Sequence, residues 1–201
     1  MKILFRRLAI VALLPAAFSC ATTEREAANT NKDPRTTYVP PAPGARNHLN
    51  SQTVLNTVHT AHVFSNPKTR DYFTLQLRGA RILTGQAHLI VTSPAGDTLR
   101  HEVLPARALL DGQTLTDPRA ATARDQEIAI LRGMNTFFAA SHFSQPAVPA
   151  REDQPAEVDA AVWQALRADP AAVAFDFPGP DGSERRLTYV RKMHRAVVLS
   201  Q

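Results

Sequence analysis

Strict alternation of apolar and polar residues marks the first clear element of the chain. Phe73, Leu75 and Leu77 alternate with Tyr, Thr and Gln, and a period of two residues is typical of a strand with one buried face. Gly79 interrupts this pattern, and a second run follows over residues 81–93. We therefore predict two consecutive strands in this part of the chain.

A tight hairpin is predicted where the second run ends. Residues 93–97 (Ser-Pro-Ala-Gly-Asp) place proline first and glycine third in a three-residue loop, which suits a type I turn followed by a left-handed residue. A loop of this length fixes the register of the strands on either side. The predicted pairs are Val91 with Leu99, Leu89 with His101, Ala87 with Val103 and, on the other face, His88 with Glu102.

In this register His101 is the one polar residue on the apolar face of the hairpin. An imidazole in such a place must find a hydrogen-bond partner or stay uncharged. We interpret His101 as a satisfied core or core-edge histidine, with a functional role as the alternative.

Residues 119–143 are predicted to form the main core helix. Asp117 before Pro118 suits an N-cap followed by proline at the first helical position. The apolar stripe at helical spacing consists of Ile128, Leu131, Met134 and Phe138, widened by Ile130 and Phe137. Gly133 within this helix costs roughly 1 kcal/mol relative to alanine, which points to a close approach by another element.

A second, shorter helix is predicted over residues 155–168, after a loop that prolines interrupt. Its apolar residues are Val158, Val162 and Leu166, with Trp163 beside them. Pro170 follows the last helical position, which ends the helix.

Strand patterning returns after the second helix. Val173, Phe175 and Phe177 alternate with smaller or polar residues, and residues 187–193 form a return arm beyond a turn. The apolar run at 196–199 either continues that arm or forms a third strand after a kink.

Together these elements predict an α+β fold, with a mostly antiparallel β-sheet, β-hairpins at both ends of the domain and two central helices packed on one face. Residues 49–64 open the domain as either a strand or a marginal helix. About 150 residues suffice for one domain with a single core, so residues 48–201 are assigned to a single globular domain. With one cysteine in the chain, no internal disulfide is expected.

The N-terminus resembles an export signal. Residues 1–19 begin with basic residues and continue into an apolar stretch that is shorter than the roughly 20 residues needed to span a bilayer. The tetrapeptide at 17–20, Ala-Phe-Ser-Cys, resembles the lipobox of bacterial lipoproteins. The resemblance implies that Cys20 receives a diacylglyceryl group on its sulfur, that the signal is cut just before it and that the new amine is acylated. The alternative is ordinary signal cleavage nearby, for instance after Ala21.

Residues 20–47 are predicted to be a disordered tether that starts at the lipidated cysteine. They are rich in Thr, Asn, Pro and charged residues, and such a segment cannot bury enough apolar surface to become ordered. Two or three acyl chains hold a protein stably on a membrane, so we expect anchoring at the bacterial cell envelope. Ala21 stands where enteric inner-membrane lipoproteins carry Asp, which favours the outer membrane.

Charge narrows the range of partners. Three of the 23 Lys and Arg residues lie in residues 1–19, so the rest of the chain carries 20 basic against 18 acidic residues. This small excess, together with export, argues against nucleic acid as a partner. The basic residues near the C-terminus are Arg185, Arg186, Arg191, Lys192, His194 and Arg195. This stretch suits an envelope protein or an anionic polymer, whereas the simpler interpretation is a solvated strand face.

Candidate catalytic chemistry rests on three histidines, His59, His62 and His142. His59 and His62 share a face only in a helix, and neither an HExxH motif nor a cysteine cluster supplies further metal ligands. Ser141 next to His142 pairs a hydroxyl with a base but lacks the GxSxG context that exposes a nucleophile. We therefore expect neither metal nor cofactor.

Two hypotheses follow. The favoured one is a non-catalytic cell-envelope lipoprotein with a tethered binding or scaffolding domain, which predicts an exposed apolar or basic patch. The alternative is a small exported hydrolase or metal-dependent enzyme that uses His59, His62 or His142. It predicts a pocket in which at least two of these histidines approach a carboxylate or a serine.

Overall fold

The computed structural model describes residues 49–110 and 121–200. The chain divides into two units, 1–46 and 47–201, and all of the described residues belong to the second. The signal peptide, Cys20 and the tether expected from the sequence lie outside the described residues, and so does the expected helix start at residues 117–118.

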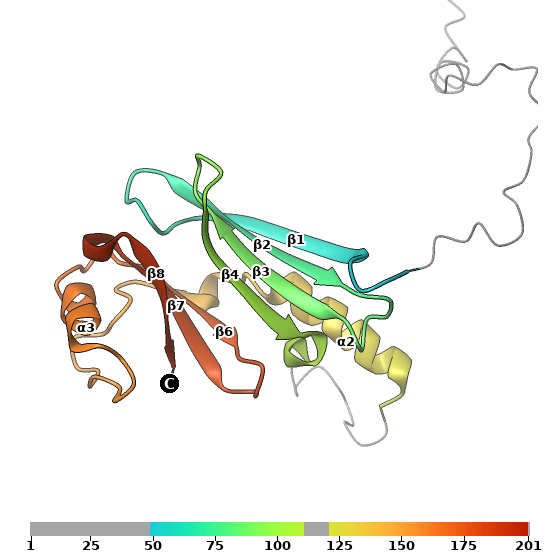
Figure 1. Ribbon diagram of the computed structural model, residues 1–201. Coiled ribbons are helices and arrows are strands. Elements are labelled where there is room, and N and C mark those ends of the chain that lie inside the picture. Colours follow the sequence, from blue (N-terminus) through green and yellow to red (C-terminus); the bar gives the residue numbers. More distant parts are fainter. Residues whose placement is uncertain (1–48, 111–120, 201) are drawn as a thin grey trace, which may run out of the picture. The chain divides into compact units, whose positions relative to one another are not determined.

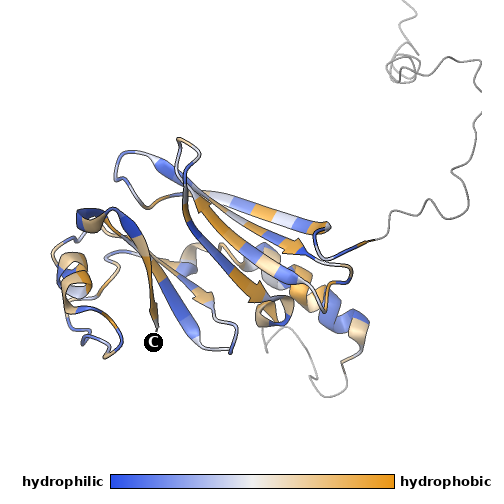
Figure 2. Cartoon of the chain, in the orientation of Figure 1, coloured by the Kyte–Doolittle hydropathy of each residue, from blue (hydrophilic) through white to orange (hydrophobic). Residues whose placement is uncertain are grey.

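The first half of the domain forms a four-stranded antiparallel sheet with the order β1-β2-β3-β4 (Figure 1). Its strands are β1 (Val54–Val63), β2 (Arg70–Arg78), β3 (Gln86–Thr92) and β4 (Thr98–Pro105). Residues 49–64, which fitted either a strand or a helix, thus supply a strand. Figure 2 shows hydrophobic and hydrophilic residues alternating along these strands, as a sheet with one buried face requires.

The second half forms another four-stranded antiparallel sheet, with the order β5-β6-β7-β8. Its strands are β5 (Phe143–Ser144), β6 (Ala174–Pro178), β7 (Glu184–Val190) and β8 (Arg195–Ser200). A short 3-10 turn, η3 (Arg191–Met193), separates β7 from β8, and His194 after it is left-handed with φ 51°. The final apolar run is therefore a third strand after a kink. The predicted α+β class and antiparallel pairing are confirmed, with the strands divided between two sheets.

The helices are shorter than predicted. They are α2 (Ala123–Thr136) and α3 (Ala160–Arg167), accompanied by the 3-10 turns η1 (Ala106–Leu109) and η2 (Ala140–His142). Thr122 caps α2, because its hydroxyl accepts from Asp125 N while the Asp125 carboxylate accepts from Thr122 N. Among these described residues, no helix has the length and apolar character needed to cross a bilayer.

The buried face of α2 keeps the predicted stripe apart from Ile128. Ala129, Ile130 and Met134 face the core, and Phe137 continues this row just beyond the helix, whereas Ile128 is 39% exposed. The spacing 130, 134 and 137 is that of one helix face, so the stripe is rotated away from Ile128. The second helix buries Val162, Leu166 and also Trp163, which was expected beside the stripe.

The β3–β4 hairpin forms around the predicted loop, but the four predicted pairs, from Val91 with Leu99 onwards, are all wrong. Ser93 N donates to Asp97 O (2.8 Å), Gly96 has φ +93°, and Thr92 lies opposite Thr98. Leu99 is then an extra residue, and the register shifts by one. The observed pairs are Val91 with Arg100, Ile90 with His101, Leu89 with Glu102, His88 with Val103 and Ala87 with Leu104.

Two leucines explain this bulge. Leu99 and Leu104 are five positions apart, so a regular strand would point them to opposite faces. The extra residue lets both reach the core, since Leu104 is fully buried and Leu99 packs against the same cluster. The shift also turns His101 outward, where it is exposed. The expected place of His101 on the apolar face is therefore wrong, and so is the pairing of His88 with Glu102.

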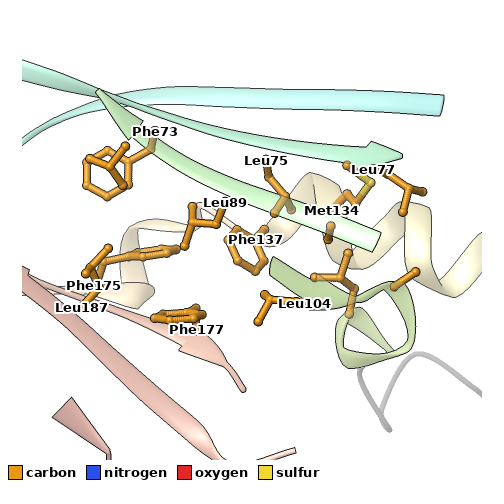
Figure 3. Packing of buried hydrophobic residues seen from close by; sticks show 14 of the residues in the cluster. Phe73, Leu75, Leu77, Leu89, Leu104, Met134, Phe137, Phe175, Phe177 and Leu187 are labelled. Carbon is orange, nitrogen blue, oxygen red and sulfur yellow. The ribbon is translucent and has the colours of Figure 1, made fainter. Parts of the chain in front are cut away.

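One hydrophobic cluster joins the inner face of the first sheet, α2 and the second sheet (Figure 3). Its members include Phe73, Leu75, Leu77, Leu89, Leu104, Met134, Phe137, Phe175, Phe177 and Leu187. A smaller cluster packs α3 against the second sheet through Val162, Trp163, Leu166 and Val190.

Gly133 of α2 allows η1 to approach the helix. A Cβ atom at this position would collide with the carbonyl oxygen of Leu109. Gly133→Ala should therefore lower the free energy of unfolding by about 1–3 kcal/mol, although alanine has the higher helix propensity. Asn135→Ala, at an exposed position of the same helix, should leave stability unchanged or slightly raised. Urea unfolding of both variants checks this, and a stabilised Gly133→Ala would contradict the close approach.

Candidate binding surface

The first sheet has one face without a covering helix among the described residues. On the other face, Asn56 of β1 donates to Met134 Sδ of α2 (3.6 Å), which places the helix on the inner side (Figure 1). Directly paired residues of antiparallel strands point to the same side, so the register defines the opposite, outward positions. They are Val54, Thr57, His59, Ala61 and Val63 on β1; Arg70, Tyr72, Thr74, Gln76 and Arg78 on β2; Gln86, His88, Ile90 and Thr92 on β3; and Thr98, His101, Val103 and Pro105 on β4. We call these residues the outer face.

The composition of the outer face is unusual for a solvated sheet. Aspartate, glutamate and lysine are all absent from it, and its only ionisable cations are two arginines and three histidines. It also exposes large apolar surface, since Tyr72 is 53% and Val103 43% exposed, while Ile90 is half-buried between them. Glu102 of β4 is partly exposed, but it pairs with the buried Leu89 and therefore belongs to the inward positions.

Two histidines form a pair at the β3–β4 side of this face. Nδ1 of His88 and Nε2 of His101 are 3.0 Å apart, and the ring centroids are 5.3 Å apart with an interplanar angle of 27°. Because an imidazole nitrogen either carries a proton or a lone pair, one of these nitrogens donates and the other accepts. The hydrogen bond requires that at least one ring is neutral.

The surroundings of His88 favour its neutral form. Partial burial lowers the pKa of His88, and the nearby positive charges of Arg78 and His101 lower it further. Arg78 is held in place by Gln76, whose side-chain oxygen accepts from Nε (3.1 Å) and Nη2 (2.5 Å). No carboxylate contributes to this pKa, in keeping with the acid-free outer face.

The three histidines proposed for catalysis do not come together. His59 is exposed on the outer face, whereas His62 points inward and its ring stacks on Phe143 with centroids 4.2 Å apart. His142 donates through Nδ1 to Phe137 O (2.8 Å). Within the described part of the chain, none of the three has a hydrogen bond to a carboxylate or a serine. His142 lines an open hollow of about 250 Å³ with Asp176, Ser183 and Glu184, but neither His59 nor His62 joins it there.

His142 and the exposed Ser141 line an open hollow of about 530 Å³ between η1, the end of α2 and Pro178. The other residues that line it are apolar residues, Gly133 and Thr136, which adds a further hydroxyl. No carboxylate lines this hollow. A nucleophilic serine would need a base, and the base would need an orienting partner. Here the partner of the imidazole is the backbone carbonyl of Phe137, and His142 and Ser141 are not joined by a hydrogen bond.

The basic C-terminal stretch is partly neutralised within the protein. Arg186 binds Asp176 and Glu152, and Arg191 binds both carboxylate oxygens of Asp169 (2.9 Å each). Arg186 thus joins β7 to β6 and to the loop that contains Glu152, and Arg191 joins η3 to the segment after α3. The side chains of Lys192, His194 and Arg195 remain exposed.

Residues 49–110 and 121–200 contain no group of three or more His, Cys, Asp or Glu side chains placed to hold a metal ion. No family model matches the chain, and neither curated proteins nor solved structures give a significant match.

The outer face was missed from the sequence because the register was misjudged. The outward positions of β2 and β3 can be read from the alternation in the sequence, and their lack of acidic residues could have indicated a binding surface. The pair of His88 and His101 depends on the bulge at Leu99, which only the packing of the two leucines reveals.

The lowered pKa of His88 predicts a pH dependence of stability. The folded protein protonates His88 less readily than the unfolded chain does. The contribution of neutral His88 to the free energy of unfolding is therefore fully present above the ordinary histidine pKa of 6.5, and it is lost as the pH falls from there towards the lower pKa of His88 in the folded protein. The free energy of unfolding should therefore fall less between pH 7.5 and 5.5 in His88→Gln than in the wild type, as measured by urea unfolding. An equal fall in both proteins would contradict the assignment.

Proposed function

We propose that the protein is a non-catalytic lipoprotein of the bacterial cell envelope, anchored through Cys20, whose domain docks a partner protein on its outer face. The observation that carries the proposal is the composition of that face. The centres of protein interfaces are depleted in Lys, Glu and Asp and enriched in aromatic residues and Arg. Tyr72, Arg78, Ile90 and Val103 sit on an uncovered sheet face that has none of the depleted types.

Charge complementarity indicates the chemistry of the partner. The outer face carries Arg70, Arg78 and three histidines with no acidic residue among them. A partner surface with carboxylates would be attracted without meeting a like charge, and a basic surface would be repelled. We therefore assign an acidic protein surface as the occupant. Because Ala21, and not Asp, follows Cys20, we place this docking at the outer membrane.

A protein suits this face better than an anionic polymer does. Two arginines of the basic C-terminal stretch, Arg186 and Arg191, are already paired with carboxylates. The exposed Tyr72 and Val103 offer apolar area that a highly charged polymer does not bury. An anionic polymer held by Lys192 and Arg195 is the competing outcome in the test below.

The anchor is tested by metabolic labelling. Radiolabelled palmitate should enter the full-length wild type and not Cys20→Ala, because the acyl chains depend on that cysteine. Labelling that persists in Cys20→Ala would rule out the lipoprotein assignment.

The docking surface is tested at Thr74, a central outward position between His59 and Ile90. Thr74→Glu places a carboxylate on the acid-free face, and Thr74→Gln is a neutral control of similar size. In pull-downs of the tagged full-length protein from detergent-solubilised membranes, we expect one acidic protein whose recovery falls with salt. Its recovery should drop about tenfold or more with Thr74→Glu and persist with Thr74→Gln.

Equal recovery with both Thr74 variants would contradict docking on the outer face. Recovery of an anionic polymer instead of a protein, lost in a Lys192→Gln, Arg195→Gln double variant, would transfer the function to the basic C-terminal surface.

A further inference from the structure

The cross-strand pair of His88 and His101 has the geometry of a chelate. Two nitrogen ligands at about 2.0–2.1 Å from one ion, at angles between square-planar and tetrahedral, lie about 2.9–3.4 Å apart. Nδ1 of His88 and Nε2 of His101 are 3.0 Å apart. The register makes His88 and His101 diagonal neighbours on adjacent strands, and their side chains already meet at this separation. Binding then needs a rotation of the rings that turns the two lone pairs towards a common point.

We propose that His88 and His101 form an open, two-histidine site for a divalent transition-metal ion, with Cu²⁺ as the preferred ion. Imidazole nitrogen suits Cu²⁺, Ni²⁺ and Zn²⁺, and Cu²⁺ binds such ligands most strongly in the divalent series. The ion takes the place of the proton shared between the rings, and that proton moves through solvent to the other nitrogen of the donor ring. Each imidazole stays neutral, so the step balances without an oxidant or a reductant.

The electrostatic surroundings act in two directions. Partial burial and neighbouring cations favour the neutral imidazole at His88, and a neutral imidazole is the form that binds a metal. The guanidinium of Arg78, fixed by Gln76, repels a bound cation and weakens the site. None of the described carboxylates belongs to this face, so the remaining coordination positions face outward and take water or an external ligand.

This site does not rest on the proposed docking function, because it needs no partner. The test uses the untagged full-length chain with Cys20→Ser, which removes the only thiol. Cu²⁺ is titrated calorimetrically at pH 7.5 with glycine as a weak competing ligand, and the bound ion is examined by electron paramagnetic resonance. We expect one site per chain with two nitrogen ligands from imidazole.

The variants locate that site. His88→Ala, His88→Gln and His101→Ala should each weaken Cu²⁺ binding at least about tenfold, whereas His59→Ala, on the same face, should bind as the parent does. Arg78→Gln should tighten binding about two- to fivefold because a neighbouring positive charge is removed. Circular dichroism checks that each variant is folded.

Absence of a stoichiometric site in the parent chain would overturn the proposal. It would also be overturned by binding that survives His88→Gln and His101→Ala, or by binding that is lost equally in His59→Ala. Failure of the Thr74 pull-down leaves this result unaffected, so the two proposals fail separately.

Discussion

Contacts between phenylalanine rings hold the two sheets on one core, and the rest of the structure depends on them. Phe175 of β6 lies 5.6 Å from Phe73 of β2, 5.5 Å from Phe137 after α2 and 4.8 Å from Phe143 of β5, measured between ring centroids. Tilted and edge-on pairs of this kind contribute about 0.5–1.5 kcal/mol each beyond the area that they bury. Figure 3 shows Phe175 and Phe177 extending from the second sheet towards the side chains of the first.

This core also decides which face of the first sheet is left for function. The inward residues of β2 and β3 pack against α2 and the second sheet, so within residues 49–110 and 121–200 no helix covers the alternating outward residues. They include no aspartate, glutamate or lysine, and they place Tyr72, Val103 and the pair of His88 and His101 on one side. The proposed docking surface and the proposed metal site thus depend on the same alternation that builds the core.

The strands and helices were largely predictable because their periodicity is local. The alternation of apolar and polar residues predicted β2 and β6, and the loop that contains Pro94 and Gly96 predicted the β3–β4 turn. The register beyond that turn was not predictable, because the bulge follows from the burial of Leu99 and Leu104 against residues distant in sequence. The start of α2 was misplaced for a different reason, because the capping box of Thr122 and Asp125 is a local signal that the prediction did not use. The close approach at Gly133 was expected, whereas its partner, Leu109 of η1, was not. Since the outer face depends on the register, the candidate site was less predictable than the fold.

Site-specific photo-crosslinking in living cells tests the central claim, that the outer face docks a protein. A benzophenone amino acid replaces Tyr72 on the outer face or, as a control, Arg132 on the exposed side of α2, in the full-length anchored chain. The account predicts that light joins the Tyr72 variant, and not the Arg132 variant, to one discrete acidic protein. Crosslinks of equal yield from both positions, or none from Tyr72, would contradict it.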